Sequence, residues 1–421
     1  MGIVSLMRNA DPIVSSILDR ALDNKEISAK DGVELFDCSG MEMNLLLMVA
    51  DDLRRRTVGD NVTYVVNRNI NFTNVCIKQC GFCAFSRDFR EEEGYFLPTE
   101  EIVRRATEAW NLGATEVCIQ AGLPPKMDGH LYLDICMAIK KELPDLHIHA
   151  FSPEEVLYGA LRLETSVEEY LKMLKHAGVG SLPGTAAEIL DQSVRDTISP
   201  GRIRVVDWIN VIKTAHSLGI PTTSTIMYGH IESSLQRAKH LALLREIQKE
   251  THGFTEFVPL NFIHTESPMY RDRKIPGIRP GADGSEVVKM HAVSRLMLNG
   301  YINNIQVSWV KEGPKVSQLL LGAGVNDFGG TLINESISTA AGAQHGQLMK
   351  PRAIRSLIRA SGRIPAQRST TYRVIKVFDE EVDDYIDPLD GADSTQFGSY
   401  QQLVKLDKFR FGHSNHEIML K

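Results

Sequence analysis

The sequence predicts an α/β protein built on a (β/α)8 barrel, and three observations carry the prediction. Amphipathic helical stretches alternate with short stretches rich in Val, Ile and Thr. A glycine ends most of the helical stretches just before the next strand candidate begins. About eight strand candidates follow one another over roughly 270 residues from position 61, and this number closes a parallel barrel.

The elements can be assigned in chain order. Residues 11–22 and 43–56 have the apolar spacing of helices, and "NVTYVVNRNINF" (61–72) has the composition of a strand. In the helix beginning at Thr99, we expect Trp110 on the buried face. An open, doubly wound sheet is the alternative, but no G-x-G-x-x-G turn follows the first strand. Helix–glycine–strand units follow at 99–122, 166–184, 205–229, 286–310 and 316–330.

The chain divides into three predicted regions. Residues 1–60 form an N-terminal helical extension, residues 61–372 form the barrel, and residues 373–421 form a short C-terminal appendage. The appendage contains "DEEVDDYIDPLDG" (379–391), which carries seven acidic residues and no basic one. Such a run is typical of a solvated tail or loop, and we assign it no function.

Composition excludes several classes of function. The formal net charge is −6 and no basic stripe is present, so we expect no nucleic-acid partner. No apolar run approaches the roughly 20 residues that cross a bilayer, so we expect no membrane partner. The first residues lack the basic region and apolar core of a signal peptide, which favours a cytoplasmic location. Six cysteines in 421 residues make no disulfide scaffold, and we expect Cys118 and Cys136 to be small buried hydrophobes.

Three cysteines stand close together directly after the predicted first strand. Cys76, Cys80 and Cys83 have the spacing C-x3-C-x2-C, at the C-terminal end of a barrel strand, where barrel enzymes carry their active sites. Structural zinc takes four ligands, and the fourth would come from a distant histidine: His147, His149 or His230. A 4Fe–4S cluster held by only three thiolates leaves one iron open to bind a small molecule. The spacing favours the cluster and leaves zinc open.

With Phe82 directly before the third cysteine, the loop resembles the signature of radical S-adenosylmethionine (SAM) enzymes. The resemblance implies that Cys76, Cys80 and Cys83 bind a 4Fe–4S cluster. It also implies that SAM occupies the open iron and is cleaved by reduction to give a 5′-deoxyadenosyl radical.

The likeness extends over residues 15–373 and is carried by "RNINFTNVC", "HIHAFSP", "SLPGTAAEIL", "NIQVSWVKEGP" and "RIPAQR". These segments resemble the second subunit of FO synthase, the family of 5-amino-6-(D-ribitylamino)uracil–L-tyrosine 4-hydroxyphenyl transferases.

The family implies a function and a set of partners. Such an enzyme joins the 4-hydroxybenzyl group of L-tyrosine to 5-amino-6-(D-ribitylamino)uracil in deazaflavin coenzyme biosynthesis, releasing 2-iminoacetate, methionine and 5′-deoxyadenosine. Its expected partners are FO synthase subunit 1 and an electron donor of the flavodoxin or ferredoxin type. A futalosine-pathway menaquinone enzyme shares the cysteine loop and is one alternative. A non-catalytic metal-binding module is the other.

The resemblance also implies SAM contacts beyond the cysteines. Gln120-Ala121-Gly122 stands where related enzymes have a Gly-Gly-Glu-like element; a plain turn is the alternative. Glu188 would bind the ribose hydroxyls from a helix after Pro183-Gly184, where a carboxylate also suits the helix dipole. A strand ending in "TIMYGHIE" partly matches the adenine-contacting strand. The predicted cofactor-binding residues are Phe82, Gln120, Gly122, Glu188, Met227 and Gly229.

Substrate contacts are predicted from their place at strand ends. His147 and His149 lie two apart and share a strand face, and His149 is nearer the C-terminal end. A histidine held by its neighbours inside the barrel is an equal alternative. The sequence identifies no catalytic acid or base. The predicted substrate-contacting residues are His149, Ser308, Asn326 and Asp327.

Overall fold

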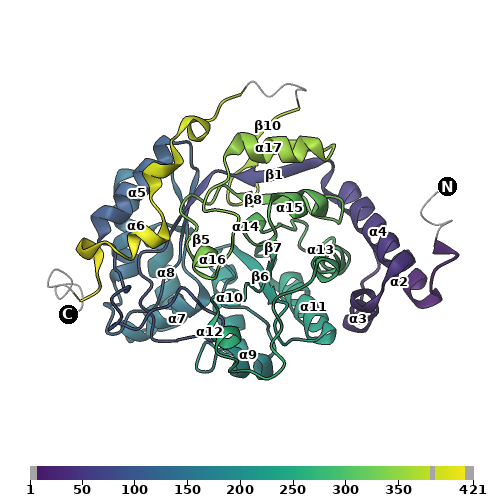
Figure 1. Ribbon diagram of the computed structural model, residues 1–421, viewed down its shortest axis with the longest axis horizontal. Coiled ribbons are helices and arrows are strands. Elements are labelled where there is room, and N and C mark those ends of the chain that lie inside the picture. The colour runs from purple at the N-terminus through teal and green to yellow at the C-terminus, as the bar shows by residue number, and fades with distance from the viewer. Residues whose placement is uncertain (1–6, 380–384, 413–421) are drawn as a thin grey trace.

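The computed structural model describes residues 7–379 and 385–412 (Figure 1). The first barrel strand is split into β1 (Asn61–Val65) and β2 (Asn67–Ile70). β2 pairs in parallel with β3, and the parallel order continues through β4 to β5. These three strands are β3 (Glu116–Ile119), β4 (His147–His149) and β5 (Val179–Ser181).

Single parallel bridges close the ring. Leu182 pairs with Thr222 and joins β5 to β6, and β6 pairs in parallel with β7. Ile305 pairs with Phe257 of β7, and the next residue, Gln306, pairs with Asp327 of β8. β8 returns to β1 through Thr63, so the predicted barrel is confirmed. The remaining barrel strands are β6 (Thr222–Tyr228), β7 (Phe254–Asn261) and β8 (Asp327–Gly330).

Helices surround this ring (Figure 1). The longer ones are α5 (Thr99–Asn111), α6 (Leu131–Glu142), α7 (Pro153–Arg162), α8 (Val167–Ala177), α10 (Val205–Ser217), α11 (Ser234–Thr251), α13 (Gly284–Leu298) and α17 (Pro351–Ala360). The shorter ones are α9 (Gln192–Ile198), α12 (Pro268–Arg271), α14 (Trp309–Glu312), α15 (Pro314–Leu320) and α16 (Ile337–Ala340). Of the helices in the described ranges, none has both the length and the apolarity that crossing a bilayer requires.

The N-terminal helices form a layer on one side of the barrel (Figure 1, purple). They are α2 (Pro12–Leu22), α3 (Ala29–Asp37) and α4 (Gly40–Val58). Asp11 begins α2 by accepting hydrogen bonds from two first-turn N–H groups, and Ser28 begins α3 with a capping box. α3 packs against α11 and α4 against α13, so the extension shares the barrel's hydrophobic core.

The C-terminal region also packs on the barrel. β9 (Ile364–Arg368) pairs in parallel with β1, and β10 (Val374–Val377) pairs antiparallel to β9, so this hairpin spans the predicted boundary at residue 373. Short turns follow: η1 (Pro388–Gly391), η2 (Ser394–Phe397), α18 (Tyr400–Leu403) and η3 (Asp407–Phe409).

The acidic segment differs from the solvated tail that its charge predicts. Asp387 is buried and forms an ion pair with Arg355 of α17, which is itself fully buried. Leu389 is buried as well, so residues 385–391 dock on the barrel because a buried cation draws the carboxylate in. The rest of the acidic run, residues 380–384, lies outside the described residues.

Three further local predictions were wrong. Glu188 lies in a loop with a positive φ of 38°, not in a helix, because the next helix starts only at residue 192. Trp110 is 38% exposed, because the buried stripe of α5 runs through Ile102, Ala106 and Ala109 and Trp110 lies beside it. The seventh strand is reduced to its bridging residues, and α14 follows almost at once.

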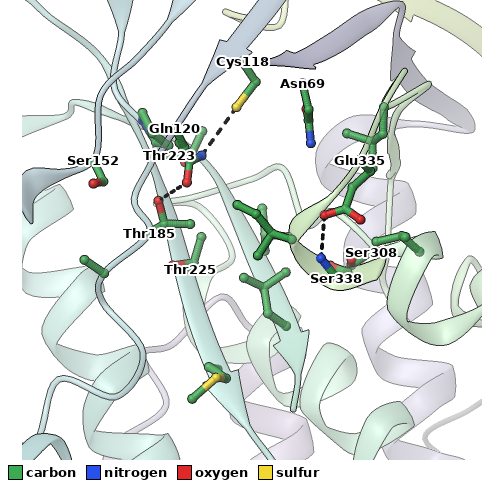
Figure 2. A pocket seen from close by; sticks show the side chains of 18 of the residues that line it. Asn69, Cys118, Gln120, Ser152, Thr185, Thr223, Thr225, Ser308, Glu335 and Ser338 are labelled. Carbon is green, nitrogen blue, oxygen red and sulfur yellow. Dashed lines mark hydrogen bonds between the residues drawn. The ribbon is translucent and has the colours of Figure 1, made fainter. Parts of the chain in front are cut away.

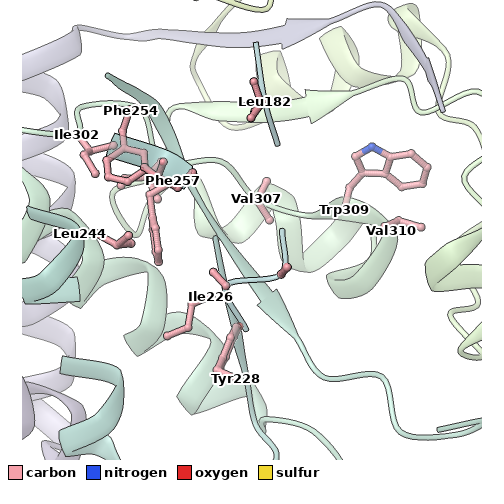
Figure 3. Packing of buried hydrophobic residues seen from close by; sticks show 14 of the residues in the cluster. Leu182, Ile226, Tyr228, Leu244, Phe254, Phe257, Ile302, Val307, Trp309 and Val310 are labelled. Atoms are coloured by element: carbon pink, nitrogen blue, oxygen red, sulfur yellow. The ribbon is translucent and has the colours of Figure 1, made fainter. Parts of the chain in front are cut away.

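Packing between the strands and α11 and α13 fixes the direction of the strand ends. Figure 3 shows Phe254 and Phe257 of β7 beside Leu244 of α11 and Ile302, all buried. On the opposite side of that view, the buried Trp309 donates from its indole Nε1 to the carbonyl of Gly330, 2.8 Å away. This bond joins α14 to the end of β8.

His240 of α11 joins two segments that both line the site described below. Its Nδ1 accepts from the N–H of Leu190 at 3.0 Å, and its Nε2 donates to the carbonyl of Thr225 in β6 at 2.9 Å. Burial lowers the pKa of His240 to about 3. Protonation in the folded state would turn the Nδ1 acceptor into a donor facing another donor.

We therefore expect His240 to contribute to acid unfolding. Its folded pKa lies below the ordinary value of about 6.5, so its stabilisation is present above that pH and is lost as the pH falls towards 3. The free energy of unfolding should fall by up to about 1.4 kcal/mol per pH unit in this window from His240 alone. Denaturant unfolding at a series of pH values should show a shallower slope for His240→Gln. The matched control is the exposed His130→Gln; an equal change of slope in both variants would contradict the assignment.

Candidate active site

A cavity opens at the C-terminal ends of the barrel strands. Its volume is about 390 Å³, and its lining comes from most strands of the barrel, from the segment after β5 and from the cysteine loop after β2. Figure 2 shows Gln120, Thr185 and Thr225 on one side of it and Glu335, Ser308 and Ser338 on the other. This is the face on which barrel enzymes carry their active sites.

Main-chain hydrogen bonds tie the cysteine loop to three neighbouring segments: the loop after β3, the end of α9 and α12. Ile77 N–H donates to the carbonyl of Leu123 at 2.9 Å, and Gly81 N–H donates to that of Ile198 at 3.0 Å. The Gly81 carbonyl accepts in turn from the N–H of Met269 at 2.7 Å. The loop is therefore held in place by the barrel and not by its own residues alone.

Two of the three cysteines line the cavity and the third lies just behind them. Cys76 and Cys83 are in the lining, and Cys80 is buried at 4% exposure. The Cys80 Sγ accepts a hydrogen bond from Arg202 Nη1 at 3.0 Å. Burial raises the pKa of the Cys80 thiol to about 11, and the charge of Arg202 opposes that rise. A guanidinium in this position favours the thiolate that metal binding requires.

Gly122 allows the loop after β3 to touch the cysteine loop. Its N–H donates to the carbonyl of Thr73 at 2.9 Å, and a Cβ at this position would lie 2.3 Å from the carbonyl oxygen of Val75. No side chain fits this contact. Gly122 thus has a packing role at the very point where the resemblance predicts a cofactor contact.

Arg202 links the cysteines to the predicted ribose contact. It lies 5.6 Å over the Phe82 ring, and its Nη2 is 3.4 Å from Glu188 Oε1. Arg195 Nη1 donates to the other carboxylate oxygen of Glu188 at 2.9 Å. Two arginines therefore contact this cavity-lining carboxylate, one at each oxygen.

The other predicted cofactor residues fall into two groups. Phe82, Gln120 and Met227 line the cavity together with Gly122 and Glu188. Gln120 accepts from Thr185 Oγ1 at 2.8 Å, and its carbonyl accepts from the Asn71 amide. Gly229 is not in the lining; its N–H donates to Glu232 at 2.7 Å.

The donor set fits an iron–sulfur cluster better than a single metal ion. Three thiols stand on one loop, and each ligand of a cluster binds a different iron. Over residues 7–379 and 385–412, no three His, Cys, Asp or Glu side chains are grouped so as to hold one metal ion. The three histidines proposed as a fourth zinc ligand are engaged elsewhere: His147 and His149 with Ser181, and His230 with the Met227 carbonyl.

A dense polar group forms the deep end of the cavity. His149 Nδ1 bonds to Ser181 Oγ at 2.7 Å, and burial lowers the pKa of His149 to about 4, so the ring is neutral near pH 7. Beside it, Glu116 accepts from Asn67 Nδ2 at 2.8 Å. All of these except Ser181 line the cavity.

Arg368, Glu256 and Gln306 complete the deep end. Arg368 Nη2 lies 3.4 Å from Glu256 and 3.0 Å from Asp327. Burial raises the pKa of Glu256 to about 7, Arg368 opposes the rise, and Asp327 adds to it. The deep end therefore offers both hydrogen-bond donors and acceptors. It carries both a positively charged side chain, Arg368, and carboxyl groups.

Two predicted substrate contacts do not reach the cavity. Asp327 is fully buried and accepts from Thr63 Oγ1 and Arg368 Nε, each at 2.5 Å. Asn326 accepts from Arg295 Nη2 at 2.8 Å, on the outer side of the strand. Of the four predicted substrate residues, His149 and Ser308 line the cavity.

Sequence reasoning missed most of the lining, although one signal was present. Lining residues alternate along the strands, as the period of two requires: 67 and 69 in β2, 116 and 118 in β3, 223, 225 and 227 in β6, and 256, 258 and 260 in β7. Cys118, expected to be a buried hydrophobe, belongs to this inward set. Arg202 had no such signal, because it lies on a loop 122 residues away from Cys80.

Comparison with known families agrees with the fold and the cysteine loop. A model of the radical SAM superfamily matches residues 70–244, and one described as the CofH/MqnC C-terminal region matches residues 251–381. Two solved structures share the fold. The maturase HydG of the [FeFe]-hydrogenase has a TM-score of 0.65 at 17% identity, covering 86% of this chain and 78% of its own. Methylornithine synthase (PylB) has a TM-score of 0.63 at 19% identity, covering 83% and 97%.

The barrel, the three-cysteine loop and the superfamily match define a radical SAM enzyme. Two curated relatives narrow this further, and both are named 5-amino-6-(D-ribitylamino)uracil–L-tyrosine 4-hydroxyphenyl transferase. The protein from Methanothermobacter thermautotrophicus is 50% identical over 86% of this chain and 97% of its own length. The one from Methanocaldococcus jannaschii is 50% identical over 84% and 98%. The chain belongs to this family of 4-hydroxyphenyl transferases.

The contact at Gly122 predicts the effect of a single methyl group. Gly122→Ala would force the β3 loop and the cysteine loop apart, which should cost about 1–3 kcal/mol in the free energy of unfolding. Iron bound per chain after anaerobic reconstitution should fall clearly below that of the unaltered protein. Gly284→Ala is the matched control, since its Cβ would meet no atom within 4 Å. Full iron loading of the Gly122→Ala protein would show that the loop contact is not needed to form the metal site.

Proposed function

We propose that this enzyme carries out the reaction of its family with the cavity described above. That reaction joins the 4-hydroxybenzyl group of L-tyrosine to 5-amino-6-(D-ribitylamino)uracil. The observation that carries the proposal is the family match at 50% identity over 86% of the chain, which spans nearly the full length of the relative. The three-cysteine loop beside a cavity of about 390 Å³ supports it, because two substrates and SAM need such a space.

Membership of the radical SAM superfamily implies a 4Fe–4S cluster and SAM, and we assign their ligands as follows. Cys76, Cys80 and Cys83 would hold the cluster, with Arg202 favouring the Cys80 thiolate. When bound, the cluster and SAM supply the 5′-deoxyadenosyl radical that abstracts hydrogen from the substrate. The residues that would hold SAM are Phe82, Gln120, Gly122, Glu188 and Met227, all of which line the cavity.

These residues provide binding and exclusion of water more than acid–base chemistry. The Glu188 carboxylate suits a cis-diol, because its two oxygens can accept from two adjacent hydroxyls. Met227 and Phe82 present apolar surface on either side of a polar ligand. Enclosing a radical in a closed barrel prevents its reaction with solvent.

We assign the deep polar end of the cavity to the diaminouracil. Its ring carries N–H donors and carbonyl acceptors, and its ribityl chain carries several hydroxyls. Arg368 and Asn67 can donate, Glu256 can accept, and neutral His149 can do either. A site built for such hydrogen bonds rejects analogues that lack them, since its own buried groups would stay unpaired.

The remaining partners are also proposals. An electron donor of the flavodoxin or ferredoxin type would approach the cysteine loop, where Ile77 is 48% exposed. FO synthase subunit 1 would receive the product. We propose a cytoplasmic location, because all six cysteines are unpaired and the cytoplasm keeps thiols reduced.

A futalosine-pathway enzyme is the second candidate. One observation favours testing it. The family model that matches the C-terminal half carries two names, CofH and MqnC, so this match does not distinguish the two candidate functions. The two candidates differ in substrate, so a product analysis decides between them.

The decisive assay is anaerobic turnover of the reconstituted enzyme with reductant, SAM, L-tyrosine and 5-amino-6-(D-ribitylamino)uracil, read by mass spectrometry. We expect a product equal to the diaminouracil plus a hydroxybenzyl group. Cys80→Ala should abolish both this product and 5′-deoxyadenosine, because one cluster ligand is lost. Cys38→Ala, which removes a buried thiol from the N-terminal layer, should retain both.

Other outcomes point elsewhere. Deoxyadenosine without the adduct would favour the futalosine-pathway candidate. An iron-replete protein that forms no deoxyadenosine would overturn the enzymatic proposal and favour a metal-binding module.

A further inference from the structure

We infer that Lys311 and Glu335 form a pair of opposite charges that binds the ammonium and carboxylate groups of the amino-acid substrate. This inference rests on the proposed function and extends it to a named subsite. Lys311 belongs to α14, after the seventh strand position, and Glu335 lies in the loop after β8. Both line the cavity.

The pair lies apart from the residues assigned to SAM. The SAM residues lie in the segments after β2, β3 and β5 and in β6 itself. Lys311 and Glu335 follow the seventh and eighth strands. Figure 2 shows the separation: Gln120 and Thr185 stand on one side of the cavity and Glu335 and Ser338 on the other. SAM held by the cysteine loop would therefore leave this wall free for another ligand.

Lys311 differs from the other cations of the lining. Arg202 contacts Cys80 and Glu188, and Arg368 contacts Asp327 and Glu256. Within the described ranges, the Lys311 ammonium has no hydrogen bond or ion pair within bonding distance. Burial lowers its pKa, and the nearby carboxylates Glu335 and Glu312 oppose the shift. The Lys311 side chain is half-buried in the cavity lining, so an anionic group of a ligand in the cavity can form an ion pair with it.

Glu335 is already oriented towards the cavity. It is 4% exposed; its Oε1 accepts from Ser338 N–H at 2.8 Å, and its Oε2 accepts from Thr339 N–H at 3.2 Å. Oε2 also accepts from Thr339 Oγ1 at 3.4 Å. These bonds fix the carboxylate at the start of α16 (Figure 2) and leave a lone pair of Oε1 for a ligand. An ammonium group can donate to this oxygen.

The chemistry of the pair selects tyrosine over the diaminouracil. A free amino acid brings one anion and one cation, so it satisfies Lys311 and Glu335 together and adds no net charge to the cavity. The diaminouracil has no carboxylate to offer. Apolar side chains for the phenol ring line the same cavity; they are Leu260, Phe262, Ile263, Val310 and Ile337.

Two analogues isolate the two charges. Tyramine lacks the carboxylate of tyrosine, and 3-(4-hydroxyphenyl)propanoate lacks its amine. Lys311→Met should weaken tyrosine binding by about tenfold or more, since a charge-assisted bond is lost, but should leave inhibition by tyramine within about twofold. Glu335→Gln should weaken tyrosine similarly and spare the propanoate. Lys315→Met, on an exposed lysine of α15, is the matched control and should change neither.

The readouts are the tyrosine KM, the two inhibition constants and equilibrium dialysis of labelled tyrosine on the reconstituted enzyme. The SAM KM and deoxyadenosine formed without tyrosine should be unchanged in each variant. If Lys311→Met does not fold, Lys311→Gln answers the same question. An unchanged tyrosine affinity, an equal loss of tyramine, or a raised SAM KM would each overturn the inference.

Failure of the proposed function has a separate signature. In that case the unaltered enzyme forms no adduct and binds no tyrosine in dialysis. If the unaltered enzyme binds tyrosine and both Lys311→Met and Glu335→Gln bind it equally well, the proposed function is retained and the inferred subsite is wrong.

Discussion

The barrel depends on one buried carboxylate at its seam. Asp327 accepts from Thr63 of β1, from Arg368 of β9 and from the N–H of Gly329 in its own strand. These bonds join the last strand of the ring to the first and fasten the C-terminal hairpin beneath the cavity. A carboxylate in this position needs a buried cation, and Arg368 supplies it. Asp327 thus contributes both to the closure of the ring and to the charge of the deep end of the cavity.

From that constraint follows the division of the cavity. On the cysteine side, Glu188 and Glu154 balance the charge of Arg202. At the deep end of the cavity, Asp327 and Glu256 balance the charge of Arg368. The wall formed by α14 and the loop after β8 is different, because within the described ranges its two charged residues, Lys311 and Glu335, form no ion pair with each other. Three chemically distinct regions in one cavity suit a reaction that brings together a sulfonium cofactor, an amino acid and a polar heterocycle.

The parts outside the barrel act on the same site. The C-terminal segment reaches the cysteine loop, where Asn74 lies 3.4 Å from the Tyr400 hydroxyl and the Phe85 and Tyr400 rings are 5.5 Å apart. The antiparallel bridge between Tyr95 and Arg410 continues this contact. Residues beyond 381 lie outside both family models, yet part of this segment packs against the loop that carries the cysteines.

The sequence by itself determined the order of helices and strands, the barrel and the three-cysteine loop. Each of these depends on local periodicity or on spacing within a few residues, which a linear reading preserves. Of the predicted ligands, the ones confirmed to line the cavity lie next to the cysteines or at strand ends, such as Gln120, Glu188 and His149. Glu188 lines the cavity but lies in a loop and not in the predicted helix, and its contact with the SAM ribose stays a prediction.

Only the tertiary structure decided which charges meet. The position of Asp327 near a strand end predicted a substrate contact. In the structure its carboxylate instead binds Arg368, 41 residues later in the chain. Arg202 reaches Cys80 across 122 residues, and Lys311 and Glu335, from different strand ends, both line the cavity. Such pairings arise from closing a ring whose strands are far apart in the chain. Periodicity shows which residues point inward, and only the closed barrel shows which of them touch.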